Sequence, residues 1–151
     1  MAEVVAQSLS QELLSLLQGE RFVMLSTISK QSGAPYVSAI SWVYAPEVST
    51  ILFAVNSKSV IVENIQHNHL VTLSVFAEGS VYSIHGRARI KADRMENVPL
   101  KLTMVEITIE EVRDVMFYGS RIAIEPRYEK TYDTRAAEKL DKQVMQALKN
   151  A

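Results

Sequence analysis

The sequence contains no cysteine. Disulfide bonds, thiolate zinc sites and cysteine nucleophiles are therefore excluded, and the composition fits a reducing compartment. An excess of charge of one sign is also lacking, because 16 Lys and Arg residues stand against 17 Asp and Glu residues. A chain with this balance has no overall attraction to nucleic acid or to anionic membranes.

Long apolar runs are missing as well. No stretch approaches the roughly 18 apolar residues of a membrane-spanning helix, and Glu3 stands where a signal peptide carries positive charge. We therefore expect a cytoplasmic protein with neither a membrane nor a nucleic acid as partner. With 151 residues and 48% hydrophobic content, a single domain over residues 1–151 is expected.

The common catalytic motifs are absent too. The sequence has no Gly-x-Ser-x-Gly elbow, no phosphate-binding P-loop and no dinucleotide glycine fingerprint. His67 and His69 have the spacing of metal ligands on one side of an extended chain, but no third ligand accompanies them. No metal site is expected, and the catalytic residues of any enzyme activity stay unknown.

Helices are predicted at both ends of the chain. The first spans residues 8–18, where leucines recur at helical spacing, Ser8 and Gln11 resemble a capping box, and Gly19 suits the end. The second spans residues 134–150, where one face is apolar and the cap is Asp133 or Thr134.

Between these helices the pattern changes to strands. Alternation and turn signals place strands at 20–29, 35–44, 51–55, 70–76, 81–90, 100–109 and 121–125. Gly86, on the apolar face of its strand, has no side chain, so we expect another group to approach the backbone closely there. A change of alternation near Met104 indicates a bulge or a strand boundary. The predicted fold is mainly β, an antiparallel barrel over residues 20–126 with peripheral helices.

One polar turn lies between a buried strand and a possible helix start. Asn56, Ser57, Lys58 and Ser59 follow the strand at 51–55, and we predict a helix over 59–68 despite its β-branched residues. Backbone N–H groups and hydroxyls at a helix start favour an anion. A turn that only caps the helix is the more common reason for such residues.

Three passages carry a resemblance to a known family. They are residues 22–41 (FVMLSTISKQSGAPYVSAIS), 53–71 (FAVNSKSVIVENIQHNHLV) and 84–90 (IHGRARI). In this order, over about residues 20–124, the chain resembles the pyridoxamine 5'-phosphate oxidase-like, FMN-binding split-barrel family.

The resemblance implies a six-stranded split barrel that forms a homodimer and holds FMN, its small-molecule ligand, at the dimer interface. It assigns the cofactor site to two segments, one along the second strand and one after the third. The residues at these positions are Ala39, Ile40, Ser41, Trp42, Val55, Asn56, Ser57, Lys58 and Ser59.

The chain also departs from the family pattern. Val60 and Ile61 stand where the family has two basic phosphate ligands, which leaves Lys58 as the nearby cation. The long C-terminal segment of the true oxidases has no counterpart, so oxidation of pyridoxamine phosphate is not expected. Two functions remain: an FMN-dependent oxidoreductase of unidentified substrate, or a non-redox split-barrel binding module. Haem or a deazaflavin in place of FMN also stays open.

Overall fold

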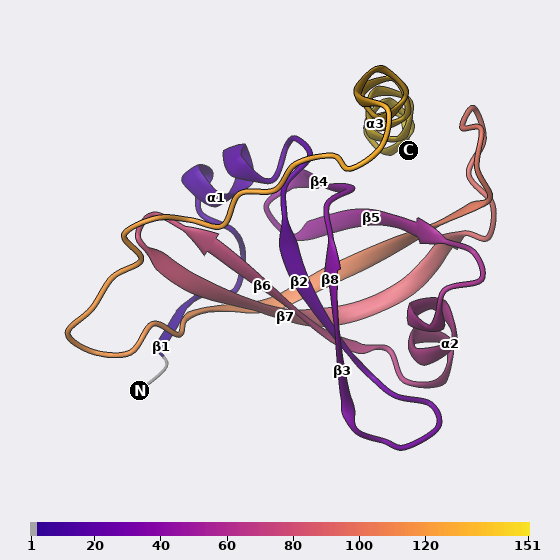
Figure 1. The fold of residues 1–151 in the computed structure, drawn as a ribbon. Coiled ribbons are helices and arrows are strands. Elements are labelled where there is room, and N and C mark those ends of the chain that lie inside the picture. Colours follow the sequence, from indigo (N-terminus) through magenta and orange to yellow (C-terminus); the bar gives the residue numbers. More distant parts are fainter. Residues whose placement is uncertain (1–2) are drawn as a thin grey trace.

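The computed structural model describes residues 3–151 and, from residue 6 onward, their side chains. The described residues form one β-sheet and three helices (Figure 1). In chain order the elements are β1 (Glu3–Ala6), α1 (Gln11–Leu16), β2 (Val23–Ile28), β3 (Pro35–Ile40), β4 (Val43–Glu47), β5 (Thr50–Asn56), α2 (Val60–His67), β6 (Leu70–Ala77), β7 (Ser80–Ala92), β8 (Leu102–Asp114) and α3 (Thr134–Lys149).

Seven strands follow one another across the sheet in the order β3-β2-β6-β7-β8-β5-β4, and β1 pairs with β8. Every pairing is antiparallel. The long strands β7 and β8 curve through the middle of the molecule (Figure 1). The predicted mainly β, antiparallel architecture with helices at both ends is confirmed. The strand order from β3 to β4 contains seven strands, one more than the six that the family resemblance implied.

The interior of the curved sheet is filled by alternate residues of its strands. On β2 the buried Val23 and Leu25 alternate with half-buried neighbours, and on β5 Phe53 is fully buried. Gly86 lies on this face, where a Cβ atom would collide with the carbonyl oxygen of Thr108 on β8. The predicted close approach at Gly86 is confirmed.

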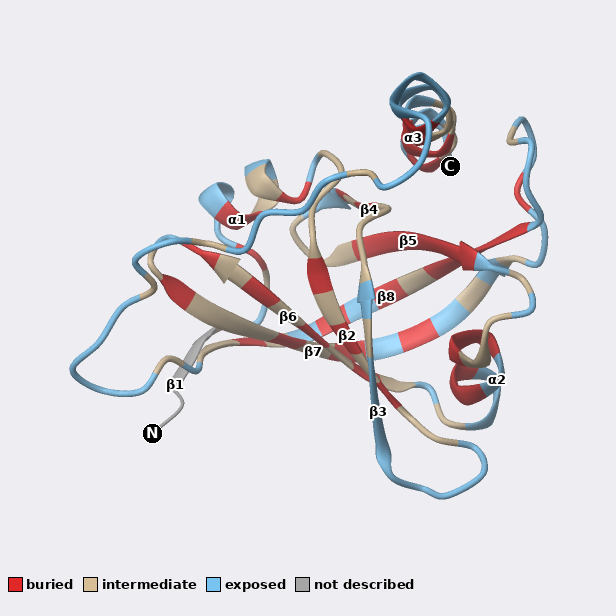
Figure 2. Cartoon of the chain, in the orientation of Figure 1, coloured by how far each residue is buried: buried red, intermediate tan, exposed pale blue. Residues whose placement is uncertain are grey.

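A second apolar layer covers the outside of the sheet. Helix α3 lies over β4 and β5 with its buried side toward them (Figure 2). The layer consists of Leu52, Ala54, Met95, Leu102, Met104, Val144, Met145 and Leu148. Among the described residues, no helix is long and apolar enough to cross a membrane.

This layer explains the changed alternation near Met104. Strand β8 runs without a break opposite β5, from Leu102 to Thr108. The strand boundary predicted there is wrong, because Met104 faces α3 while Val105 faces the interior, so both alternations are buried. The bulge lies in the partner strand β7, between Ile90 and Ala92.

The first helix is shorter than the predicted 8–18. It begins at Gln11, and its cap is Ser10, whose hydroxyl accepts a hydrogen bond from the Leu13 N–H at 3.1 Å. The capping box predicted at Ser8 and Gln11 is therefore wrong. Ser10 satisfies an N–H group that has no partner within the helix.

The predicted strand 35–44 is two strands. The Ser41 carbonyl accepts hydrogen bonds from the N–H groups of Arg21 and Val43, both at 3.0 Å, and this tight turn redirects the chain from β2 to β5. Pro46 lies inside β4. An edge strand tolerates proline because one row of its N–H groups needs no partner.

The predicted strand at 121–125 is also wrong. This part of the connection from β8 to α3 is held by isolated contacts and not by a ladder. The Ile122 N–H donates to the Gly79 carbonyl at 2.7 Å, and the Arg21 guanidinium binds Glu125 at 2.9 Å and the Phe76 carbonyl at 2.7 Å.

A polar network fixes α3 to the sheet. The Lys130 ammonium donates to Glu20 at 2.7 Å and lies 3.1 Å from Asp141 of α3. It also lies 5.3 Å from the centre of the Tyr128 ring. On its other side, Asp141 accepts a hydrogen bond from the Trp42 indole at 2.8 Å. The network joins α3 to the residue before β4, so α3 and its apolar layer depend on it.

We predict that Lys130→Met destabilises the fold by about 1–3 kcal/mol near neutral pH, because it leaves two carboxylates without their cation. Burial lowers the pKa of Lys130, but Glu20 and Asp141 outweigh burial and raise that pKa above its usual 10.5. The contribution is therefore fully present below pH 10.5 and is lost as pH rises through the raised pKa.

Urea unfolding of the wild-type protein and of this variant, at pH 7 and at rising pH above 10.5, checks the prediction. The difference in their free energies of unfolding should decrease as pH rises above 10.5. The control is Lys139→Met, on the exposed side of α3. Equal losses of stability for the two variants at pH 7 would contradict it.

Candidate functional site

The structure brings the two predicted cofactor segments together at one end of the β4–β5 pair. Val43 pairs with Phe53, and beyond this pair the Ala54 N–H donates to the Trp42 carbonyl at 3.0 Å. The chain that enters β4 therefore lies beside the chain that leaves β5, which continues into the Asn56 turn.

The turn from Asn56 to Ser59 is closed by its own hydrogen bonds. The Asn56 side chain accepts from the Lys58 N–H at 2.8 Å, and the Asn56 carbonyl accepts from the Ser59 N–H at 2.9 Å. Ser59 caps α2, since its hydroxyl accepts from the Ile61 N–H at 3.1 Å. The predicted helix is confirmed. An anion could use these three N–H groups only by displacing the bonds that form the turn.

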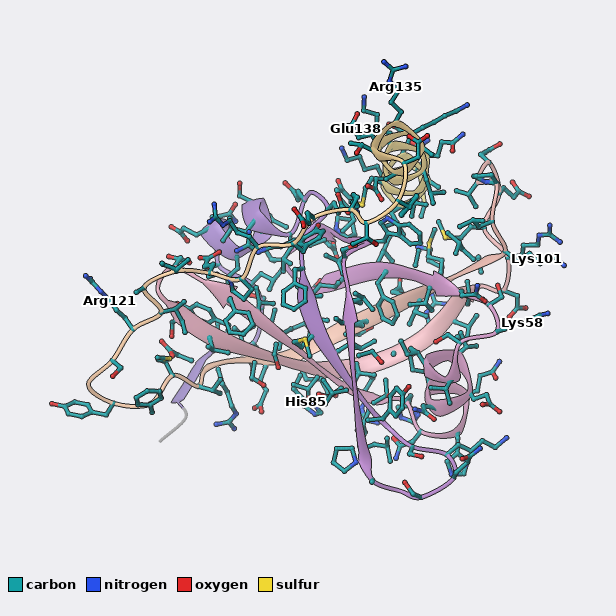
Figure 3. All side chains as sticks on the ribbon, viewed as in Figure 1. Lys58, His85, Lys101, Arg121, Arg135 and Glu138 are labelled. Atoms are coloured by element: carbon teal, nitrogen blue, oxygen red, sulfur yellow. The ribbon has the colours of Figure 1, made fainter. Side chains whose placement is uncertain are left out.

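Two lysines flank this turn. The Ser57 N–H donates to the Lys101 carbonyl at 3.0 Å, which places Lys101 beside Lys58 at the same end of the molecule (Figure 3). Both side chains are exposed, and neither forms an ion pair with any residue in the described part of the chain. Lys101 was not among the residues expected at this turn, because only the pairing of Asn56 with Leu102 in the folded sheet places it there.

The apolar residues after the turn have a structural reason. Ile61, Val62 and Ile65 are buried where α2 packs on the sheet. A basic side chain at position 61 would have to be buried in this contact, which is costly for an unpaired charge. The packing of α2 therefore explains the apolar residue at position 61.

The second-strand segment presents fewer polar groups. Ala39 is exposed on β3, Ile40 packs against the interior, and the Ser41 hydroxyl lies 3.4 Å from Glu20. The Trp42 indole is held by Asp141 and packs in the α3 layer. Its ring is therefore not available to stack on a flat ligand while α3 stays in place.

Charged residues on the outside of the sheet pair with one another. On the outside of β7, Arg87 binds Glu110 at 3.0 Å and Arg89 binds Glu106 at 2.8 Å. Such exposed pairs contribute little to stability. Within residues 3–151, no group of three His, Asp or Glu side chains is arranged to hold a metal.

The available donors fit a phosphate only in part. The ammonium groups of Lys58 and Lys101 are exposed at the turn. The Ser59 hydroxyl can donate its proton to a ligand, because its oxygen accepts a hydrogen bond from the Ile61 N–H and its proton is not used in that bond. No buried polar side-chain atom in the described residues lacks a partner, so no unpaired buried group awaits a ligand. Exposed donors of this kind suit an anionic group. Among the described residues, no catalytic acid, base or nucleophile is assembled beside the turn.

Comparisons with solved structures show the same fold. A protein of Lactobacillus delbrueckii, described as a candidate pyridoxamine 5'-phosphate oxidase, has a TM-score of 0.62 at 20% identity and covers 74% of this chain and 98% of its own. HupZ of Group A Streptococcus has a TM-score of 0.59 at 15% identity, covering 77% and 99%. An F420 reductase has a TM-score of 0.52 at 17% identity, covering 65% and 93%. At these identities the likeness establishes the fold alone.

No curated protein sequence matches the chain significantly. The model of the pyridoxamine 5'-phosphate oxidase family matches residues 9–116, more than half of the sequence. The chain therefore belongs to the pyridoxamine 5'-phosphate oxidase family, and its fold is the split barrel of that family.

Proposed function

We propose that the protein is an FMN-binding flavoprotein that holds the cofactor phosphate at the turn between β5 and α2. The observation that carries this proposal is that Lys58 and Lys101 form no ion pair within the described residues and lie beside the Ser59 hydroxyl, whose proton can be donated to a ligand. Membership of the family supports a flavin-type ligand. The flavin ring would then extend from the turn toward Ala39, Ile40 and Ser41.

The proposed phosphate site is weak for a defined reason. A hydrogen bond to a charged group contributes about 1.5–3 kcal/mol when well placed, but exposed ammonium groups are mobile and screened by salt. The backbone N–H groups of the turn add little, because they are already engaged. We therefore expect affinity for FMN that falls clearly as salt concentration rises.

When bound, the flavin supplies hydride or electron transfer, which explains why the chain needs no nucleophile of its own. The role of the protein is to hold the phosphate through Lys58 and Lys101 and to place the ring against the edge at Ala39. In this proposal the protein is a redox enzyme, and pyridoxamine phosphate is not expected to be its substrate.

The phosphate site predicts a difference between FMN and riboflavin, which lacks the phosphate. We expect the wild-type protein to bind FMN about tenfold or more tightly than riboflavin, a ratio equivalent to about 1.4 kcal/mol or more. In Lys58→Ala/Lys101→Ala most of this preference should be lost, because, of the proposed phosphate donors, only the Ser59 hydroxyl remains. Quenching of flavin fluorescence measures both affinities.

Arg121→Ala is the control for this experiment, since Arg121 is an exposed cation at the far end of the molecule (Figure 3). It should leave the preference for FMN intact. A preference for FMN that is undiminished in the double variant would remove both lysines from the site.

We further propose that two chains associate through β3. This strand pairs only with β2 among the described strands, and most of it is exposed (Figure 2). Its exposed side chains include Tyr36 and Val37, which are 41% and 54% exposed. An open strand edge with apolar residues favours pairing with another chain. A second copy would close the side of the site at Ala39, where this chain provides no wall.

A homodimer is thus the expected state in light scattering at micromolar concentration. Val37→Lys should shift the mass toward the monomer, because it places a charge in the proposed interface. Val115→Lys is the matched control, since Val115 is also exposed but lies beyond β8. Dimers that persist in Val37→Lys as in the control would exclude this interface.

A non-redox binding module is the second candidate function. It is favoured by the closed turn and by the Trp42 ring, which α3 holds against the sheet. A visible spectrum recorded after incubation with FMN and desalting separates the candidates, because only a flavoprotein retains a perturbed flavin band. The same experiment with a deazaflavin tests whether the protein holds such a cofactor in place of FMN, an alternative that the similar fold of the F420 reductase supports.

A further inference from the structure

We propose a second ligand site between the C-terminal half of α3 and the connection from β7 to β8, which takes a small organic anion with an apolar body. The pocket there has a volume of about 690 Å³. This lies within the range of about 300–1,000 Å³ that small-molecule sites occupy. No residue of the nine assigned to the cofactor lines it.

The floor of the pocket is apolar. Met95 and Met104 line it and are 4% and 6% exposed, so they belong to the α3 layer while facing the pocket. Ala92 and Ala147 complete the floor and are small enough to leave space above it. Methionine side chains adapt their shape to an apolar ligand at little cost.

The charges around this floor are unequal. Lys91, Arg94 and Lys142 line the pocket, against Glu96 as the one acidic side chain among its described lining residues. Lys91 forms an ion pair with Glu106, with 3.4 Å between the ammonium nitrogen and a carboxylate oxygen. Arg94 and Lys142 form no ion pair with any residue that the structure describes, so their charges are available to a ligand.

The helix determines how the ligand would lie. The carbonyl end of α3 carries partial negative charge, which repels an anion near Asn150. Lys142 lies two turns earlier, on the same wall of the pocket. The acidic group of the ligand therefore belongs at Arg94 and Lys142, and its body extends over the methionines toward Gln146.

This site is independent of the β5–α2 turn. The two sites share no lining residue; they meet at Asp93, whose carbonyl accepts hydrogen bonds from Thr103 at 2.8 Å and from the Ser57 hydroxyl at 3.4 Å. Loss of FMN binding therefore does not imply loss of the pocket, and the reverse also holds.

The test uses two fluorescent probes of similar size, the anionic 8-anilinonaphthalene-1-sulfonate and the neutral N-phenyl-1-naphthylamine. The wild-type protein should bind the anion more tightly, and Arg94→Gln/Lys142→Gln should weaken its binding about tenfold or more. The same variant should leave the neutral probe unchanged. Ala147→Trp should weaken both probes, since the indole fills the pocket.

Arg135→Gln/Lys139→Gln is the control, because it removes the same charge from exposed positions in the N-terminal half of α3, which does not line the pocket; Figure 3 labels Arg135. Circular dichroism melting confirms that each variant is folded. Equal anion affinity in the pocket and control variants would overturn the proposal. So would binding of both probes that is unchanged in Ala147→Trp, or no binding of the anionic probe to the wild-type protein.

Discussion

The antiparallel pairing of β5 with β8 is the constraint on which the rest of the structure depends. It sets Asn56 opposite Leu102, so the turn before α2 meets the chain that enters β8. The bond from the Ser57 N–H to the Lys101 carbonyl follows directly from this register. A slip of one residue would move the residues of one strand to the opposite face of the sheet. It would also offset Asn56 from Leu102 and so move Lys101 away from the turn.

The same pair of strands divides two environments. Toward the interior, Phe53 and Val105 belong to the main core, and toward the outside Leu52 and Met104 lie under α3. Because α3 covers the outer face and its network engages Trp42, the proposed flavin site lies at the edge at Ala39 and at the turn. The cavity beside Met104 exists because α3 covers this face only in part.

Local patterns in the sequence were sufficient for most elements but not for their long-range contacts. The alternation along β7 predicted its buried face, and Gly86 predicted the close approach to β8. The division of 35–44 was missed because it depends on a turn at Ser41 whose carbonyl binds Arg21. Lys101 was missed for the same kind of reason, since only the sheet register places it at the turn. The proposed cofactor residues were inferred from family resemblance.

Backbone amide NMR during titration with FMN shows where the cofactor binds, and so tests whether its phosphate is held at the turn between β5 and α2. We expect the largest chemical-shift changes at Ser57 to Val60 and at Lys101, with smaller changes at Ala39 to Ser41. Amides of α3 beyond Lys142 should change little. The absence of shifts at millimolar FMN, or shifts centred on α3 with none at the turn, would contradict it.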